Sequence, residues 1–300
     1  MNGKLYIVAT PVGNLGDMTP RAIDILRGAD IIAAEDTQNS MTLLTKFDIK
    51  TKLVSNHKFN ETSSVAYFIN ELLSGKNVAL ISDAGTPCIS DPGSVLVKKA
   101  AENNIEVLAI PGACAAAAAV SISGFDVKSF IFEGFFPREN TETKRIIKKL
   151  TDNPGVYIFY ESPKRIIKTF ETFAGNIPGA DICLCNDLTK KFEKVYRGSP
   201  AEVLQNLRNN PSAEKGEYTI VIELVGNAAI NERSSFCVPR IAPNENPSLE
   251  SIIVDVMIKQ KCTVKDAVKH IASDGAYGFS KNEVYAASLG LKKMFNDIVK

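Results

Sequence analysis

The sequence predicts an α/β protein made of two α/β domains and a small C-terminal helical module. Short apolar runs alternate with helix-like segments over residues 4–226, and in the first third of the chain the unbroken apolar strands are typical of a parallel sheet covered on both faces. Loops rich in Gly and Pro separate these segments. Residues 226–248 are instead rich in Asn, Pro and Ser, which predicts a linker, and the sequence after them is helix-like.

Length and composition agree with more than one domain. A chain of 300 residues is longer than one ordinary core supports, and its 45% hydrophobic and 23% charged residues are typical of a soluble globular protein. We therefore expect an N-terminal domain at residues 1–125, a second domain at 126–226, and a linker with the helical module at 227–300.

In the first domain, each apolar strand leads into a loop and then a helix. Thr19 followed by Pro20 is a helix start signal, because the threonine hydroxyl accepts from a free backbone N–H and proline fits the first helical position. The predicted elements are strands at 4–9, 30–35, 77–82 and 105–110 and helices at 20–27, 94–104 and 113–123.

The second domain and the tail continue with further strands and helices. In the tail, the pairs Thr263 with Asp266 and Ser280 with Glu283 have capping-box spacing, which predicts two short helices in a helix-turn-helix-like arrangement. In the second domain, the apolar run at 129–137 is followed by strands at 155–162, 180–187, 192–198 and 216–226 and by helices near 139–150, at 163–175 and from residue 199.

Charge, hydropathy and cysteine content argue against several classes of protein. The formal net charge is +1, and dedicated nucleic-acid binders are often far more basic, so any polyanion site must be a local patch. No apolar run approaches the roughly 20 residues of a transmembrane helix, and the N-terminus lacks the features of a signal peptide. Six scattered cysteines without a CxxC, beside only two histidines, argue against a zinc site and favour free thiols in the cytoplasm. Cys183 and Cys185 are expected to face one packed side of a strand.

Four unusual loops directly follow predicted strands, at residues 10–16, 35–37, 82–93 and 111–115. Because the carboxyl ends of parallel strands share one edge, we expect these loops to form a ligand crevice there. The alternative is a set of long surface connections. The motifs GxxxxGK[ST], GxGxxG after the first strand, and GxSxG are absent, which argues against a P-loop ATPase, an ordinary dinucleotide fold and a serine hydrolase.

The loop residues suit a ligand held by backbone groups and small side chains. Asp83 and Asp91 could bond a hydroxylated or cationic ligand, or could cap the turn and the following helix, and we favour capping for Asp91. The small residues at 113–119 either leave room for a ligand or only let a helix sit close to the sheet. Three loop glycines allow a ligand to approach the main chain: Gly85, Gly93 and Gly112.

Several motifs occur in the order and spacing found in the tetrapyrrole methylase superfamily. They are LYIVATPVGNLGDMTPRA, AAEDT, LISDAGTPCISDPG, PGACAA, FEGFFPR, FYESPKR and DLTK. Over about residues 4–226 the chain resembles the RNA-modifying branch of that superfamily, and SDAGTPCISDPG together with YESPKR is the most specific part of the resemblance.

The resemblance implies a homodimer that binds S-adenosylmethionine (SAM) between two α/β domains. It implies 2′-O-methylation of a cytidine ribose in the decoding region of 16S rRNA, either within the small ribosomal subunit or as free rRNA. Carried over to this sequence, the cofactor pocket comprises Pro11, Asp83, Ala84, Gly85, Thr86, Pro87, Ile89, Ser90, Asp91, Pro92, Gly112, Ala113, Cys114, Ala115 and Tyr160.

Methyl transfer to a hydroxyl depends on alignment and can also use a group that takes the hydroxyl proton. Four candidates lie just beyond strand ends, namely Glu35, Asp36, Glu161 and Lys190. For Glu161 the alternative is a structural hydrogen bond to the adjacent SPKR turn. For Lys190 we favour a phosphate contact over a role as base.

Three basic runs in the second domain could follow an RNA backbone, although most such runs are simply solvated helix faces. The candidate RNA-binding residues are Lys144, Arg145, Lys148, Lys149, Lys164, Arg165, Lys191, Lys194 and Arg197.

Four positions depart from the family pattern: Gln38 replaces Arg, Cys114 replaces Ser, Lys164 replaces His and Asp187 replaces Glu. Cys114 still offers a backbone amide, whereas Gln38 removes a cation. Two rival functions are C-methylation of a precorrin-type tetrapyrrole and a nucleic-acid-binding regulator that acts through the C-terminal helices. Residues 249–300 carry eight lysines and six acidic residues, which argues against strong autonomous DNA binding.

Overall fold

The computed structural model describes residues 1–56, 61–225, 248–260, 262–273, 283–289 and 291. The chain divides into two compact units, residues 1–230 and 231–300, and each is described by itself. The predicted linker at 226–248 lies almost wholly outside the described residues, as does Ser280.

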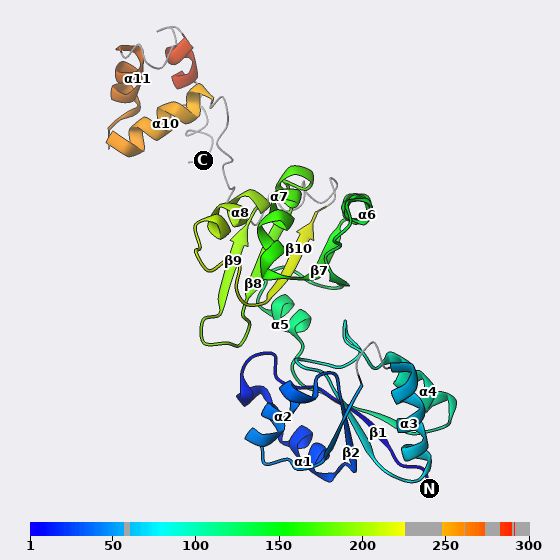
Figure 1. The fold of residues 1–300 in the computed structure, drawn as a ribbon. Helices are drawn as coiled ribbons and strands as arrows, with labels where there is room; N and C mark the ends of the chain where they lie inside the picture. Colours follow the sequence, from blue (N-terminus) through cyan, green and yellow to red (C-terminus); the bar gives the residue numbers. More distant parts are fainter. Residues whose placement is uncertain (57–60, 226–247, 261, 274–282, 290, 292–300) are drawn as a thin grey trace. The chain divides into compact units, whose positions relative to one another are not determined.

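The first sheet is entirely parallel, as the continuous apolar runs predict, and its strand order is β3-β2-β4-β1-β5. Figure 1 labels β1 and β2 of this sheet. Every residue of β2 and β4 is buried, as expected for strands with helices on both faces. The strands are β1 (Leu5–Val8), β2 (Ile31–Ala34), β3 (Lys52–Ser55), β4 (Val78–Ile81) and β5 (Val107–Ile110).

Two helices cover each face of this sheet. On one face α1 (Pro20–Gly28) and α2 (Thr37–Lys46) bury Leu26 and Leu44 against the strands. On the other face α3 (Glu61–Leu73) and α4 (Ser94–Glu102) bury Phe68. The sequence analysis did not assign α2, β3 or α3, whereas the predicted start of α1 is confirmed by a 3.1 Å bond from the Ala22 N–H to the Thr19 hydroxyl.

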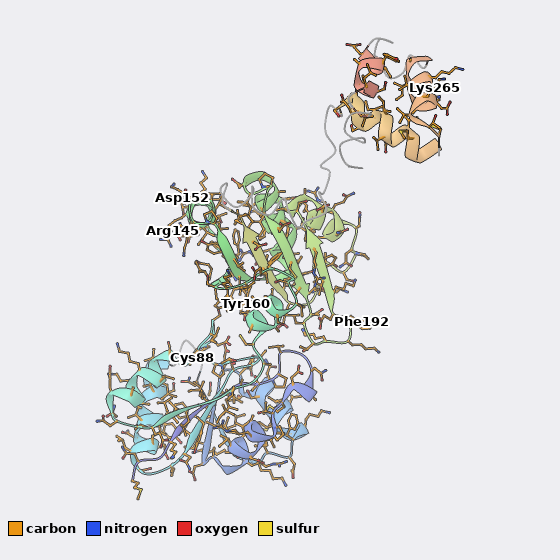
Figure 2. The ribbon with its side chains drawn as sticks, turned by 180° about the vertical axis from the view of Figure 1, so that it is seen from behind. Cys88, Arg145, Asp152, Tyr160, Phe192 and Lys265 are labelled. Carbon is orange, nitrogen blue, oxygen red and sulfur yellow. The ribbon has the colours of Figure 1, made fainter. Side chains whose placement is uncertain are left out.

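The second sheet is mixed, with order β6-β7-β10-β8-β9; β6 and β7 are parallel and the other pairs antiparallel. Helices α6, α7 and α8 cover one face around a large core (Figures 1 and 2). Its elements are β6 (Ile131–Phe135), α6 (Asn140–Asp152), β7 (Gly155–Glu161), η2 (Pro163–Arg165), α7 (Ile166–Asn176), β8 (Asp181–Asn186), β9 (Lys194–Gly198), α8 (Pro200–Arg208) and β10 (Tyr218–Leu224).

Helix α5 (Ala115–Ser121) packs on the other face of the second sheet, although it precedes residue 125 in sequence. Ala116 and Ala119 are buried there against β7, β8 and β10, so these alanines do let a helix sit close to a sheet. Cys183 and Cys185 face α5 from β8 with their sulfurs 4.0 Å apart, which confirms that both lie on one packed side.

The prediction that Asp91 caps the following helix is wrong. The residue at the N-cap of α4 is Gly93 rather than Asp91. Asp91 instead accepts a hydrogen bond from the Ser82 hydroxyl, across the loop.

In the C-terminal tail, the capping box predicted for Thr263 and Asp266 is present, since the Thr263 hydroxyl accepts from the Asp266 N–H at 3.3 Å.

In the second unit, α10 (Leu249–Gln260), α11 (Val264–Ser273) and a helical segment at 283–289 enclose a small core. Ile253, Ala267 and Val284 are fully buried in it. The turn of the predicted helix-turn-helix-like pair lies outside the described residues. Across the parts of the chain that are described, no helix is both long and apolar enough to cross a membrane.

Close packing behind the 82–93 loop makes Gly93 sensitive to substitution. Its φ is +127°, and an added Cβ would lie 2.5 Å from Leu80 Cδ2 and 2.9 Å from Cys88 Sγ. We expect Gly93→Ala to lower the free energy of unfolding, measured by urea denaturation, by about 2 kcal/mol or more.

Gly175→Ala is the matched control, because it lies in α7 with nothing within 4 Å of an added Cβ. Alanine there removes the cost of glycine in a helix, so the control should raise stability by up to about 1 kcal/mol. Equal effects of the two substitutions would contradict the packing described for Gly93.

Candidate active site

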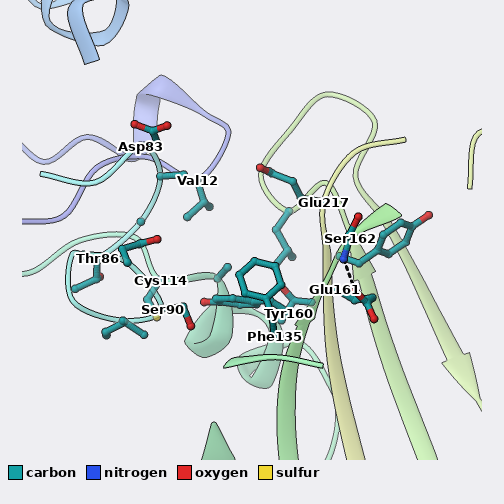
Figure 3. A pocket seen from close by; sticks show the side chains of 18 of the residues that line it. Val12, Asp83, Thr86, Ser90, Cys114, Phe135, Tyr160, Glu161, Ser162 and Glu217 are labelled. Carbon is teal, nitrogen blue, oxygen red and sulfur yellow. Dashed lines mark hydrogen bonds between the residues drawn. The ribbon is translucent and has the colours of Figure 1, made fainter. Parts of the chain in front are cut away.

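A cavity of about 400 Å³ lies at the carboxyl ends of the first sheet's strands and is closed by residues of the second sheet (Figure 3). This is where ligands bind in open parallel sheets, and the volume lies in the usual range for small-molecule sites. Its lining comes from all four predicted loops and from β6, β7, the loop after β8, and β10: Val12, Glu35, Asp83, Ala84, Gly85, Thr86, Ile89, Ser90, Asp91, Cys114, Ala115, Phe135, Tyr160, Glu161, Ser162, Pro163, Leu188, Glu217, Tyr218 and Thr219.

Most of the residues predicted for the cofactor pocket reach this cavity. Those that do are Asp83, Ala84, Gly85, Thr86, Ile89, Ser90, Asp91, Cys114, Ala115 and Tyr160. Those that lie outside the lining are Pro11, Pro87, Pro92, Gly112 and Ala113, which belong to the same loops.

Backbone pairing fixes three of these loops to one another. Thr10 and Gly85 form an antiparallel bridge, with N–H to carbonyl distances of 2.8 and 3.0 Å. The Thr10 hydroxyl also donates to the Ser82 carbonyl at 3.1 Å. Thr86 in turn donates to the Ala113 carbonyl at 3.0 Å, which joins the 82–93 loop to the loop after β5.

The 82–93 loop holds two non-glycine residues in the left-handed region, Cys88 with φ 68° and Ser90 with φ 69°. Such conformations are costly and persist where the surroundings impose them, often at ligand sites. Here they turn the chain so that Ser90 faces the cavity. Ser90 also approaches the second sheet, since a Cβ added to Gly134 would lie 3.3 Å from its hydroxyl oxygen.

Carboxylates of the first sheet's loops give one side of the cavity an acidic character. Burial raises the pKa of Asp91 to about 6, against a hydrogen bond from Ser82 that lowers it. Burial, followed by the charges of Asp91 and Asp83, also raises the pKa of Glu35. Asp83 is held in place by the Asn39 side-chain amide, which donates to it at 2.9 Å.

Aromatic rings close the opposite side of the cavity. Tyr160 of β7 meets Phe132 and Phe135 edge to face, with ring centroids 4.9 and 5.7 Å away. Burial raises the pKa of Tyr160 to about 12, so its hydroxyl stays protonated and accepts a hydrogen bond from the Ala116 N–H at the start of α5. Phe135 remains 60% exposed at the cavity.

Residues 4–204 match the family model described as Tetrapyrrole (Corrin/Porphyrin) Methylases. The chain belongs to this family. It is 39% identical over 285 residues to "Ribosomal RNA small subunit methyltransferase I" of Bacillus subtilis (strain 168), which covers 95% of this chain and 94% of that one. The protein of the same name from Haemophilus influenzae is 35% identical over 291 residues, covering 96% of this chain and 97% of that one.

Solved structures of similar fold include a cobalt precorrin-4 methyltransferase and a diphthine synthase. The first has a TM-score of 0.55 at 17% identity and covers 73% of this chain and 94% of its own. The second has a TM-score of 0.58 at 16% identity and covers 74% of this chain and 90% of its own. At these identities the likeness concerns the fold alone.

Glu161 and Asp36, two of the four predicted catalytic candidates of this methylase, are engaged in structural hydrogen bonds. Glu161 accepts from the Ser162 N–H and the Thr169 hydroxyl, both at 2.6 Å, and pairs with Arg165 at 3.1 Å. Burial raises the pKa of Glu161, against these hydrogen bonds. The structural alternative for Glu161 is therefore the one that the geometry favours. Asp36 does not line the cavity, and its carboxylate caps α2 through the Gln38 N–H at 2.7 Å.

Lys190 is held between two carboxylates, 2.9 Å from Asp187 and 2.8 Å from Glu217. Burial alone would lower the pKa of Lys190, but the hydrogen bonds and charges of these partners raise it above its usual value. A protonated, doubly paired ammonium is a poor base, and a phosphate would have to compete with both carboxylates for it.

The predicted RNA-binding residues differ in how free their charges are. Arg145, Lys148 and Lys149 of α6 pair with Glu142, Asp152 and Glu133, at 3.0, 2.7 and 2.5 Å respectively. Arg165 donates to main-chain carbonyls of residues 136 and 137, and Arg197 to that of residue 122. Among the predicted RNA-binding residues, the exposed cations for which the described part of the chain provides no ion pair are Lys144, Lys164, Lys191 and Lys194.

The cavity also includes residues that the sequence analysis did not assign to it. Five of them lie within the family motifs and could have been predicted from those motifs: Val12, Phe135, Ser162, Pro163 and Leu188. The remaining ones, at positions 217–219, lie before and at the start of β10 and carry no sequence signal, because only the strand order brings them there.

The raised pKa of Asp91 predicts a pH-dependent stability. Its folded-state pKa of about 6 exceeds the ordinary 3.8, so the folded chain binds this proton more tightly, and the free energy of unfolding falls as pH rises through that interval. Asp91→Asn removes this titration. Above about pH 7 we expect the variant to be more stable than the parent by about 1–2 kcal/mol, a value discounted for partial solvent access.

Thermal unfolding at several pH values tests this expectation. Asp126→Asn, which removes an exposed carboxylate, controls for the loss of one negative charge. A parent and an Asp91→Asn variant with parallel stability profiles between about pH 4 and 8 would contradict the assignment.

Proposed function

We propose that this methylase binds SAM in the cavity and methylates the 2′-hydroxyl of a cytidine in small-subunit ribosomal RNA. The observation that carries the proposal is that residues of the family motifs line the cavity. The chain also aligns over nearly its full length with relatives named ribosomal RNA small subunit methyltransferase I. The substrate in this proposal is small-subunit rRNA, either free or within the assembled subunit. Action on ribosomal subunits is consistent with the cytoplasm, and the resemblance further supports a homodimer.

The cavity residues fit SAM in charge and shape. Glu35, Asp83 and Asp91 face a ligand whose sulfonium and amino groups are cationic. Tyr160 and Ile89 offer apolar surface for a purine ring, and the backbone of the 82–93 loop offers hydrogen-bonding groups. When bound, the cofactor supplies an electrophilic methyl group.

The residues of the chain then have to position the hydroxyl and receive its proton. Of the four candidates, Glu35 combines a place in the cavity lining with no structural ion pair among the described residues. Burial and the neighbouring carboxylates raise the pKa of Glu35, which makes its carboxylate a stronger proton acceptor than an ordinary glutamate. We therefore assign proton acceptance to Glu35, with Glu161 and Lys190 holding the surrounding loops.

Methylation of a tetrapyrrole is the competing activity, and solved precorrin methyltransferases share the fold. Transfer of labelled methyl groups from SAM to small subunits, naked small-subunit rRNA and a precorrin, measured in parallel, separates the two. The proposal expects label in RNA and none in the precorrin. Label in the precorrin alone would overturn it.

Filling the cavity should prevent cofactor binding. Ala115 lines the cavity at the first residue of α5, and leucine is a good helix former, so Ala115→Leu adds apolar bulk with little cost to the helix. We expect calorimetry to show SAM affinity reduced by about tenfold or more.

Ala117→Leu is the control, because residue 117 is exposed on the same helix. It should leave SAM affinity unchanged. An unchanged affinity in a folded Ala115→Leu variant would place the cofactor elsewhere.

Loss of the proposed proton acceptor should affect turnover rather than binding. We expect Glu35→Gln to lower kcat about a hundredfold, the usual size of such an effect, while SAM affinity measured by calorimetry stays the same. The pH dependence of kcat should lose its acidic limb, because the glutamine does not titrate. A variant with the parent kcat and pH profile would exclude this role.

A further inference from the structure

Phe192 is an exposed aromatic residue at the tip of the hairpin that joins β8 and β9 (Figure 2). Its side chain is 73% exposed, the largest fraction of any aromatic residue that the structure describes. Single exposed apolar residues are common, so exposure alone carries no conclusion. The surroundings of this ring are what distinguish it.

The hairpin tip, residues 187–193, is firmly built and holds Phe192 out in solvent. Backbone bonds run from the Lys190 N–H to the Asp187 carbonyl at 3.0 Å and from the Glu193 N–H to the Lys190 carbonyl at 3.1 Å. The Glu193 carboxylate accepts from the Thr189 N–H at 2.7 Å. Asp187 and Thr189 adopt positive φ values of 54° and 65°, which only a well-determined turn sustains.

The hairpin tip adjoins the proposed active site. Leu188 lines the cavity, and so does Glu217, which pairs with Lys190. Phe192 lies four residues after Leu188, a separation that even an extended chain spans in about 14 Å. A nucleic-acid strand with one nucleotide in the cavity can therefore bring a neighbouring nucleotide within reach of this ring.

The positive charges around the Phe192 ring favour the binding of a polyanion. The Lys191 ammonium lies 5.5 Å from the Phe192 ring centroid. Lys191 and Lys194 are exposed, and no ion pair to either is found in the described part of the chain, in contrast to the doubly paired Lys190. Aromatic rings beside lysines are how proteins hold unpaired nucleotides, with a base on the ring and phosphates on the cations.

We propose that Phe192 stacks on an unpaired base of the substrate RNA beside the methylated nucleotide, while Lys191 and Lys194 contact its phosphates. This inference rests on the proposed rRNA methylation. It adds a binding site for a neighbouring nucleotide, outside the cofactor cavity.

The chain has no tryptophan, so a single substitution creates a specific reporter. In the full-length protein, Phe192→Trp keeps a stacking surface and should lose fluorescence when naked small-subunit rRNA or small subunits are added, because a stacked base quenches the indole. Phe130→Trp is the control: Phe130 is 46% exposed and precedes β6, at the opposite edge of the same sheet. Its fluorescence should not change.

Kinetics give a second, independent measurement. Phe192→Ala should raise KM for the RNA substrate between about fivefold and a hundredfold, the range for losing one stacked base, whereas Phe192→Trp should stay near the parent. SAM affinity and thermal stability should be unchanged in both variants, and a matched Phe130→Ala variant should behave like the parent.

The outcomes separate this inference from the function on which it rests. A parent protein that transfers no methyl group to RNA refutes the proposed function and this inference with it. A parent that methylates RNA, together with unquenched Phe192→Trp and an unchanged KM in Phe192→Ala, overturns the inference alone. A change of oligomeric state in Phe192→Ala, seen by size-exclusion chromatography, would instead assign the ring to a contact between protein copies.

Discussion

The cavity depends on one short piece of backbone pairing, the bridge between Thr10 and Gly85. Thr10 follows β1 and Gly85 follows β4, and these strands are neighbours in the first sheet. The bridge therefore joins the two loops just beyond the ends of their strands. The Thr10 hydroxyl adds a bond to Ser82, and Thr86 links the same loop to Ala113. These bonds hold in place a loop with glycines, prolines and two strained residues, and its backbone and small side chains form a preorganised wall of the cavity.

The second sheet completes the cavity because a glycine lets two loops meet. A Cβ added to Gly13 would lie 2.5 Å from Cγ of Lys190 and 3.0 Å from the Leu188 carbonyl oxygen. The stem of Lys190 thus packs against the loop after β1, while its ammonium joins Asp187 to Glu217. A lysine that sequence reasoning linked to phosphate or base chemistry instead holds the hairpin at the edge of the cavity. Its positive charge also offsets the two carboxylates it joins.

Much of the fold follows from local sequence, and the exceptions have identifiable causes. Buried strands such as β2 and β4 are continuous apolar runs, and helix starts such as that of α1 have capping residues, so both are predictable. Strand β3 is largely half-exposed at the sheet edge and has no such run, so it went unassigned. Four of the cavity's loops were predictable because parallel strands share an edge. Asp91 was misassigned because its bond to Ser82 crosses the loop and depends on how the loop folds back, which spacing does not encode.

The near-neutral net charge of this chain is the sum of an acidic region, which suits a cationic cofactor, and a basic region, which suits an RNA backbone. A cationic cofactor is favoured by carboxylates, and Glu35, Asp83 and Asp91 supply them inside the cavity. An RNA backbone is favoured by free cations, and four of the nine predicted RNA-binding residues, Arg145, Lys148, Lys149 and Arg165, are already paired with acidic side chains. Two of the unpaired ones, Lys191 and Lys194, lie on the hairpin next to the cavity. Because the cations that could contact RNA form a local patch, a net charge of +1 does not argue against RNA binding.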